Sequence, residues 1–212
     1  MTEWFPDLKP HVFISHSHQD SIQAITMAGW LNRQFGLTAF VDSCAWGYAD
    51  KLLAEIDKKY CYQVNKGTYA YEMRNKSTAH VHIMLNSALM RLMNSTECIF
   101  FINTPNSIST QTYIESKQTT ASPWLFSELT ISKLIQKRQP KEHRNEKIII
   151  KSARTFDAVF ESIDINYPAD TQHLAKIVDA DLNYWDRKFP CLPSDPATAL
   201  DVLYSLKPPN IR

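Results

Sequence analysis

The stretch HVFISHSHQD, residues 11–20, changes abruptly from apolar to polar. Its segment VFIS, residues 12–15, has the length and the β-branched and aromatic content of a short buried strand. Asp20 follows in the position of a helix N-cap, and Gln23 stands three residues later, as in a capping box. The stretch therefore predicts a buried strand, then a polar loop at its carboxyl end, and then a helix.

The helix predicted after Asp20 has one apolar face. The apolar side chains that recur at helical spacing are Ala24, Met27, Ala28, Leu31 and Phe35. Gly36 follows them, and glycine commonly ends a helix because it enters the left-handed conformation without steric cost. The pattern predicts an amphipathic helix that ends near Gly36.

Three further apolar runs are typical of buried strands: residues 37–42, 98–102 and 147–151. Between and after them, helical patterns are predicted from about Asp50, over residues 79–93, from Ser122 and Pro123, through residues 174–185, and from Asp195. Residues 59–78 have too weak a periodicity for an assignment, and residues 103–121 have the composition of a long loop.

Strands that alternate with helices favour a parallel sheet with right-handed crossovers. The strands are continuously apolar, which indicates a sheet covered on both faces. Such sheets bind ligands beyond the carboxyl ends of their strands. The polar clusters after residues 15, 42 and 102 all fall at that edge, so we expect a ligand site there.

The bulk composition excludes several classes of protein. The chain has 212 residues and a net charge of +1, with basic residues spread along its length, so we expect no nucleic-acid partner. No apolar run is long enough for a membrane span, and the first ten residues have no signal-peptide pattern. The four cysteines form no CxxC pair, as is common for reduced thiols. We therefore expect a cytoplasmic protein with no membrane partner.

His16, His18 and Asp20 have the His-x-His-x-Asp spacing of some metallohydrolases, in which a further histidine follows directly. Here Ser21 takes that place. His80 and His82 do not supply a substitute, because side chains at i and i+2 diverge on a helix. A zinc site needs at least three convergent ligands, so we expect no metal and interpret Asp20 as a helix cap.

The stretch SPWLFSEL, residues 122–129, opens a helix and carries an acidic residue on its apolar side. Glu128 lies one turn after Trp124 and shares a face with Ile131 and Ile135. An ionised carboxylate there is costly unless it has partners or faces a cleft. Two interpretations remain open from this helix alone: a structural glutamate paired with a buried polar group, or a functional carboxylate at the ligand edge.

VFISHSHQD, then FVDSCAWGYAD (residues 40–50) and SPWLFSEL together resemble the three conserved boxes of Toll/interleukin-1 receptor (TIR) domains, in the family's order. The resemblance covers about residues 11–151 and is greatest to bacterial TIR proteins that consume NAD, including those of Thoeris-type antiphage systems. It implies an α/β, flavodoxin-like three-layer sandwich with a central parallel sheet. Residues 1–154 would form the TIR domain, with an insertion at about 59–96. Residues 155–212 would form a partly helical C-terminal extension packed on that domain or completing it.

The resemblance also implies an activity, cleavage of the nicotinamide–ribose bond of NAD with Glu128 as the catalytic residue. Ordinary glycosidases use a second carboxyl group to protonate the leaving group. Nicotinamide in NAD is already cationic and leaves as a neutral molecule, so one carboxylate suffices. Glu128 would hold the ribose hydroxyls and offset the growing positive charge on the sugar.

The substrate-binding residues implied by the resemblance are His16, Ser17, Asp42, Trp46, Tyr48 and Trp124, with Gly47 as a hinge. Each has a structural alternative. The aromatic residues after the second strand can pack against the core or between subunits. Asp42 can bond to its own backbone, and the two histidines can occupy a solvated loop. The chain also departs from the family pattern at Leu125, where a cysteine is common, and over residues 59–96, which are longer than usual.

The expected small-molecule partner is NAD, as a substrate, with no permanently bound cofactor. The resemblance further implies a homo-oligomer or TIR–TIR assembly on activation and a separate effector that senses the product. The rival interpretation is a non-catalytic TIR scaffold that acts through homotypic contacts.

Overall fold

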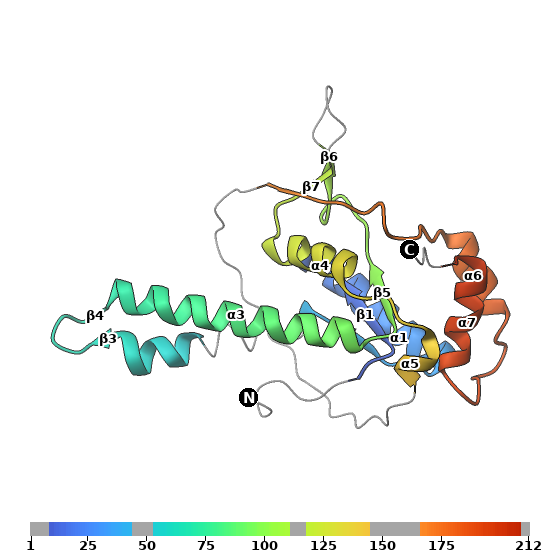
Figure 1. Cartoon of the computed structure of the whole chain (residues 1–212), viewed down its shortest axis with the longest axis horizontal. Helices are drawn as coiled ribbons and strands as arrows, with labels where there is room; N and C mark the ends of the chain where they lie inside the picture. The colour runs from blue at the N-terminus through green and yellow to red at the C-terminus, as the bar shows by residue number, and fades with distance from the viewer. Residues whose placement is uncertain (1–8, 44–52, 111–117, 145–165, 209–212) are drawn as a thin grey trace.

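A computed structural model describes residues 9–43, 53–110, 118–144 and 166–208 (Figure 1). The strands are β1 (Val12–Ser15), β2 (Ala39–Val41), β3 (Tyr62–Gln63), β4 (Thr68–Tyr69), β5 (Cys98–Phe101), β6 (Ser109–Thr110), β7 (Gln118–Thr120) and β8 (Tyr167–Pro168). The α-helices are α1 (Ser21–Phe35), α3 (Tyr71–Ser95), α4 (Pro123–Leu134), α5 (Pro140–Arg144), α6 (Asp179–Arg187) and α7 (Ala197–Leu206). A 3-10 turn, η1 (His18–Asp20), precedes α1, and a π-helical turn, η2 (Asp57–Cys61), precedes β3.

The central sheet of the described residues has three parallel strands in the order β2-β1-β5. In the register of this sheet, Phe13 of β1 lies between Phe40 of β2 and Ile99 of β5. The predicted strands at 12–15, 37–42 and 98–102 are confirmed, with slightly shorter bounds for the last two. The mixed α/β class with a parallel sheet is therefore confirmed, while the predicted fourth strand, residues 147–151, lies outside the described residues.

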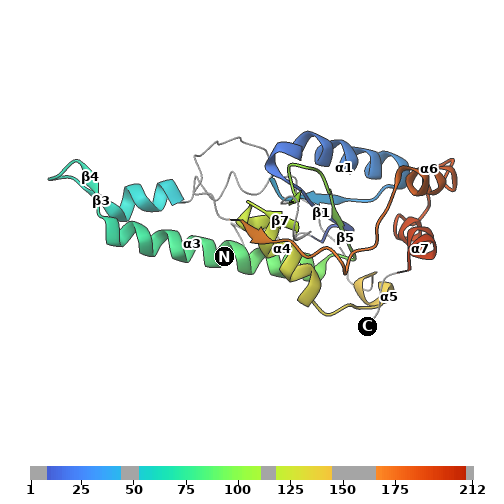
Figure 2. The same cartoon turned by 90° about the horizontal axis from the view of Figure 1, so that it is seen from above.

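Helices cover both faces of this sheet, as Figure 2 shows from above. On one face, Val12 and Ile14 share a core cluster with residues of α1, α6 and α7. On the other, Phe13 contributes to a cluster with Leu89 and Met93 of α3 and Ile131 of α4. The alternation follows from the pleat of β1, which sends successive side chains to opposite faces.

The start of α1 differs from the capping-box prediction. Asp20 stands at the N-cap position but makes no side-chain cap hydrogen bond. Its carboxylate instead accepts a hydrogen bond from the Thr104 hydroxyl and another, at 2.8 Å, from Nδ2 of Asn106. Asp20 is fully buried, so these contacts with the segment after β5 outweigh a local cap. The predicted end of the helix is correct, because Gly36 has φ 69° and its N–H bonds to Asn32 O.

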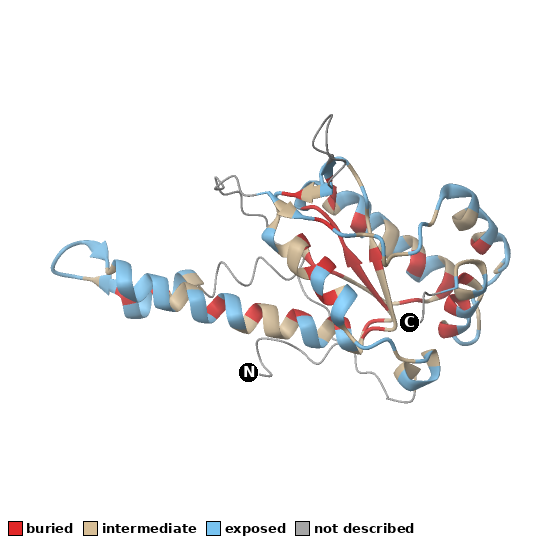
Figure 3. Ribbon diagram, turned by 45° about the horizontal axis from the view of Figure 1, so that its top comes forward, coloured by how far each residue is buried: buried red, intermediate tan, exposed pale blue. Residues whose placement is uncertain are grey.

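The segment after β2 forms an arm that extends from the body, with mostly exposed residues at its far end (Figure 3). The β3–β4 hairpin joins η2 to α3, and α3 begins eight residues before the predicted helix at 79–93. Asp57 organises this region, since it accepts hydrogen bonds from Arg74 Nε at 2.9 Å and from the Ser77 hydroxyl at 2.6 Å. The apolar residues of 59–78 show only weak helical periodicity because this exposed, two-layer arm buries little apolar surface.

Two other sequence-based assignments need correction. The predicted loop 103–121 contains β6 and β7, which with β8 form a small antiparallel sheet. The helix predicted through residues 174–185 begins only at α6, and Leu174 precedes it. Trp185 is fully buried, stacks on Phe35 at a centroid distance of 4.2 Å, and donates from Nε1 to Ala199 O at 2.7 Å. The described part of the chain holds no helix with the length and apolarity to cross a bilayer.

Candidate functional site

A cluster of polar side chains lies at the carboxyl ends of β1 and β2, where the first turns of α4 meet the sheet. The serine and histidine at the end of β1, the aspartate and serine after β2, and a glutamate of α4 form it: Ser15, His16, Asp42, Ser43 and Glu128. The start of α4 fixes the phase of its helix. The Ser122 hydroxyl accepts from Leu125 N at 3.3 Å, and Pro123 occupies the first turn, as predicted. This phase turns Glu128 toward the sheet.

Glu128 is almost completely buried, with 1% of its surface exposed. Its Oε2 accepts a hydrogen bond from the Ser15 hydroxyl at 2.5 Å. No hydrogen-bond donor reaches its Oε1 in the described part of the molecule, while the carboxyl group as a whole shares a hydrogen bond with the Asp42 carboxyl. The side chains that line the same small void are Ser15, Ile99, Phe101, Leu129, Ser132 and Leu174. A buried carboxyl group with one oxygen unpartnered is rare in folded proteins, because leaving it so costs free energy.

The protonation of Glu128 follows from these surroundings. Burial in apolar surroundings raises the pKa of Glu128 well above its usual range, and the nearby Asp42 carboxyl raises it further. The hydrogen bond from Ser15 acts in the opposite direction and lowers that pKa. Because the raising causes are larger, Glu128 holds a proton to higher pH than an ordinary glutamate does.

His16 and Asp42 form a buried ion pair beside Glu128. His16 Nδ1 lies 2.7 Å from Asp42 Oδ1, and His16 Nε2 lies 2.9 Å from the Ser43 hydroxyl. Burial by itself lowers the pKa of His16, but the hydrogen bond and charge of Asp42 outweigh it and raise that pKa. Asp42 also accepts from the backbone N–H of Ser43 at 2.8 Å, the local contact that was its structural alternative. The pair therefore links the ends of β1 and β2 and places the Asp42 carboxyl next to Glu128.

The other predicted site residues are not all brought together. Ser17 is buried, and its carbonyl accepts from Asp20 N at 2.8 Å. Trp124 packs against Val81 and Leu85 of α3 and stacks on His82 at a centroid distance of 5.6 Å. These contacts place the ring of Trp124 against the arm. Trp46, Gly47 and Tyr48 lie outside the described residues.

The three residues of the His-x-His-x-Asp pattern point to different partners. His16 faces Asp42, His18 is exposed, and Asp20 bonds to Thr104 and Asn106. Within the described residues, no group of three histidine, cysteine or acidic side chains could hold a metal ion. The spacing in the sequence therefore does not become a convergent set of ligands in the fold.

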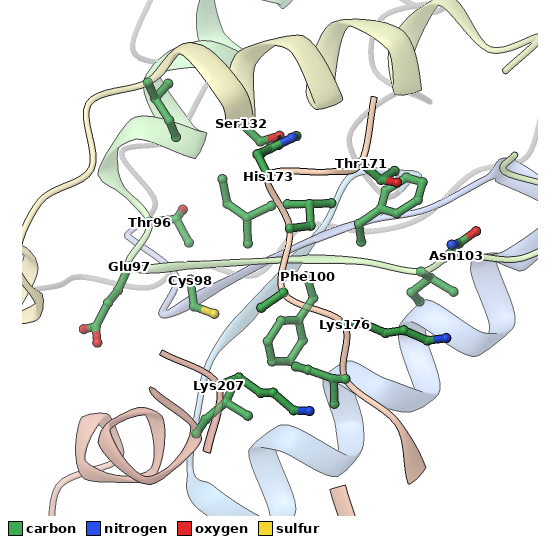
Figure 4. Close-up of a pocket in the computed structure, with 18 of the residues that line it drawn as sticks. Thr96, Glu97, Cys98, Phe100, Asn103, Ser132, Thr171, His173, Lys176 and Lys207 are labelled. Carbon is green, nitrogen blue, oxygen red and sulfur yellow. Dashed lines mark hydrogen bonds between the residues drawn. The ribbon is translucent and has the colours of Figure 1, made fainter. Parts of the chain in front are cut away.

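A large cavity of about 1310 Å³ is lined by the residues of β5 together with residues of α1, α4 and the segment 171–177, some of which are labelled in Figure 4. Ser132 and His173 face each other at 2.8 Å in its wall. Glu128 does not line it, but four residues line both this cavity and the void at Glu128: Ile99, Phe101, Ser132 and Leu174. One layer of side chains thus separates the carboxyl group from the cavity. Among the described residues β5 is an edge strand of the central sheet, so the cavity lies along the side of that sheet and not at the carboxyl ends of its strands.

Sequence reasoning missed Ser15 and Ser43. Both serines follow predicted strands, so their location at the edge of the sheet could be predicted from the sequence. No neighbouring residue in the sequence indicates which group each hydroxyl contacts. Ser15 and Glu128 are separated by 113 positions in the chain. Only the packing of α4 against the end of β1 brings them together.

No protein-family model, no curated protein and no solved structure matches this chain.

Proposed function

We propose that this chain is a TIR-domain enzyme with a flavodoxin-like fold that cleaves NAD at the nicotinamide–ribose bond. The observation that carries the proposal is Glu128. It is a buried carboxyl group at the carboxyl ends of parallel strands. Ser15 donates to one of its oxygens, no donor reaches the other among the described residues, and the Asp42 carboxyl lies within hydrogen-bonding reach. No basic side chain pairs with it there, so it is not a structural ion pair.

The chemistry fits a single carboxylate. The C–N bond between ribose and nicotinamide breaks with its electron pair moving onto the positively charged ring, which leaves as neutral nicotinamide. Positive charge grows on the ribose, and the ionised Glu128 offsets it. The acceptor at the ribose carbon is water or a nucleophile of the substrate itself, which yields linear or cyclic ADP-ribose.

The two acidic side chains favour a cationic ligand. The Asp42 carboxyl lies close enough to disfavour ionisation of Glu128, and a positive charge placed between the two carboxyl groups relieves that repulsion. Oxidised nicotinamide carries such a charge and reduced nicotinamide does not. Asp42 and His16 would therefore tune the site, with Ser17, Trp46, Tyr48 and Trp124 as further candidates for substrate contact.

The burial of Glu128 supports a closed resting state in the isolated chain. With 1% of its surface exposed, the carboxyl group cannot reach a dinucleotide without a rearrangement of its surroundings. We therefore propose that assembly into a homo-oligomer opens the site, in the cytoplasm, and that the product signals to a separate effector.

A non-catalytic scaffold remains the second candidate, favoured by the exposed apolar residues of the arm. They include Tyr60, Val64 and Tyr71, which are 59%, 82% and 78% exposed. Residues of this kind are enriched in protein interfaces.

The deciding experiment measures nicotinamide release from NAD over a range of protein concentrations, with a crowding agent to promote assembly. Glu128→Gln keeps the shape of the side chain and removes its charge, and Glu72→Gln, at an exposed position of α3, is the matched control. We expect turnover in the wild type and in Glu72→Gln, and loss of turnover in a folded Glu128→Gln. Turnover that persists in Glu128→Gln, or its absence from the wild type in every assembly state, contradicts the proposal.

A further inference from the structure

Ser15, the last residue of β1, has 2% of its surface exposed and donates its hydroxyl to Glu128 Oε2 at 2.5 Å. We propose that Ser15 is a positioning residue, which fixes Oε2 of Glu128 and so leaves Oε1 as the oxygen that meets the ligand. The inference rests on the proposed function, since it assigns Ser15 a role in the work of Glu128.

The geometry that supports this role begins with the sheet. Ser15 pairs with Phe101 of β5, and its carbonyl accepts from Ile102 N at 2.9 Å, so its backbone is held on the side of β5. A glutamate carboxyl group otherwise rotates freely about its last bond, because that torsion has broad minima. A hydroxyl anchored on a strand stops this rotation and distinguishes the two oxygens.

The hydrogen bond also has an electrostatic effect. A hydroxyl that donates to a carboxylate stabilises the ionised form more than the protonated form. In the apolar surroundings of Glu128 this contribution opposes burial and the charge of Asp42. Ser15 therefore keeps the ionised state accessible at a position that otherwise resists it.

The groups that face Glu128 from the neighbouring elements are few in the described part of the chain. Asp42, after β2, faces Glu128 through its charge and through a hydrogen bond between the two carboxyl groups, and His16, after β1, is paired with Asp42. From α3, Asn86 accepts from Ser127 of α4 and brings no charge. His173, from the segment before α6, bonds to Ser132 one turn further along α4. Removal of the Ser15 hydroxyl therefore changes one contact and leaves these charges in place.

The test uses the full chain and five variants. Ser15→Ala removes the donor, Ser15→Cys replaces it with a weaker one, and Ser15→Thr restores a hydroxyl. Ser107→Ala is the control, because Ser107 is equally buried and hydrogen-bonded but contacts Ile102 and Thr104 instead of Glu128. The titration of Glu128 is followed by NMR in protein labelled with carboxyl-¹³C glutamate. The resonance is assigned by its loss in Glu128→Gln, and nicotinamide release is measured across pH.

We expect the titration midpoint of Glu128 to rise in Ser15→Ala, to rise less in Ser15→Cys, and to stay near the wild type in Ser15→Thr and Ser107→Ala. The value of kcat near neutral pH should fall in Ser15→Ala and recover as pH rises, with KM little changed, because a smaller fraction of Glu128 is ionised at a given pH once the stabilising hydroxyl is removed.

An unchanged midpoint in Ser15→Ala, or an equal shift in Ser107→Ala, overturns the role of Ser15. If the wild type releases no nicotinamide at any pH, the proposed function fails, while the NMR titration still decides whether Ser15 controls the carboxyl group. The two failures are thus distinguishable.

Discussion

Nδ1 of His16 lies 2.7 Å from Oδ1 of Asp42, and the two side chains are 0% and 6% exposed. This pair joins the end of β1 to the end of β2 and places an imidazole beside the carboxyl groups of Asp42 and Glu128. Buried ion pairs offset their desolvation only with good geometry and additional hydrogen bonds, which Ser43 supplies to both partners.

Asp42→Asn should lower the pKa of His16. Asp42 is the source of both the hydrogen bond and the charge that raise this pKa against the effect of burial. Without the charge, burial dominates and the imidazole loses its proton at lower pH. An NMR titration of the His16 ring protons in the wild type and in Asp42→Asn measures the shift. A His16 midpoint that does not move contradicts the assigned pair.

The free energy of unfolding should fall as pH rises from the usual range of a glutamate pKa toward the raised pKa of folded Glu128. The folded state binds the proton more tightly than the unfolded state, so this contribution is complete below the unfolded pKa and is lost with increasing pH. The slope for one such group is at most about 1.4 kcal/mol per pH unit. His16, whose pKa is also raised, contributes in the same direction between its unfolded and folded pKa values.

Glu128→Gln removes the Glu128 part of that dependence. Urea denaturation at several pH values should give a flatter profile for the variant than for the wild type, and the variant should be the more stable of the two at alkaline pH. Parallel profiles would show that Glu128 does not carry an elevated pKa.

NAD binding should release protons, and NADH binding should release fewer. A cationic ring beside Glu128 and Asp42 favours the ionised form of Glu128, whereas the neutral reduced ring does not. Isothermal titration calorimetry in buffers of different ionisation enthalpy measures the number of protons released. Glu128→Gln is the control and should abolish the difference between the two ligands. Equal proton release with NAD and NADH would count against a site tuned for positive charge.

Trp185→Ala should destabilise the protein by about 3–5 kcal/mol, because it empties a fully buried aromatic site between α1 and α7. The neighbouring Tyr184→Ala is the matched control. Tyr184 is 46% exposed, and its loss should change stability by less than about 1 kcal/mol. Urea denaturation followed by circular dichroism measures both. A small effect of Trp185→Ala would mean that residues 166–208 do not pack on the sheet as described.

Removal of metal should leave stability unchanged. His16, His18 and Asp20 make separate contacts, so dialysis against a chelator removes nothing on which the fold depends. Elemental analysis of the purified protein and the thermal midpoint before and after dialysis are the measurements. Zinc at one equivalent per chain that disappears in His16→Ala would contradict this expectation.

Local signals in the sequence were sufficient for the central elements. The apolar run at 12–15, the glycine at position 36 and the Ser122–Pro123 pair each predict a strand or a helix boundary that the structure confirms. The reason is that strand burial, left-handed caps and N-caps depend on residues within one turn of each other. The parallel pairing followed from the alternation of strands and helices alone.

Other features depended on distant partners. Asp20 has the sequence context of a helix cap, yet it bonds to residues more than 80 positions away, because a buried carboxylate takes the strongest donors that the fold brings to it. Trp124 shares a helix face with Glu128 but packs on α3, whose length was not visible in its weak periodicity.

By itself, then, the sequence determined the strands of the parallel sheet, the bounds of the helices with strong caps, and the position of Glu128 on the apolar face of its helix. Only the tertiary structure decided what that carboxyl group meets: a hydroxyl from β1, a second carboxyl from the end of β2, and a layer of apolar side chains that closes over it. The physical reason is the separation along the chain of the residues that interact. A cap or an apolar stripe is a contact between neighbours in the chain, whereas the protonation of Glu128 is set by groups that only the packing of three separate elements places within reach.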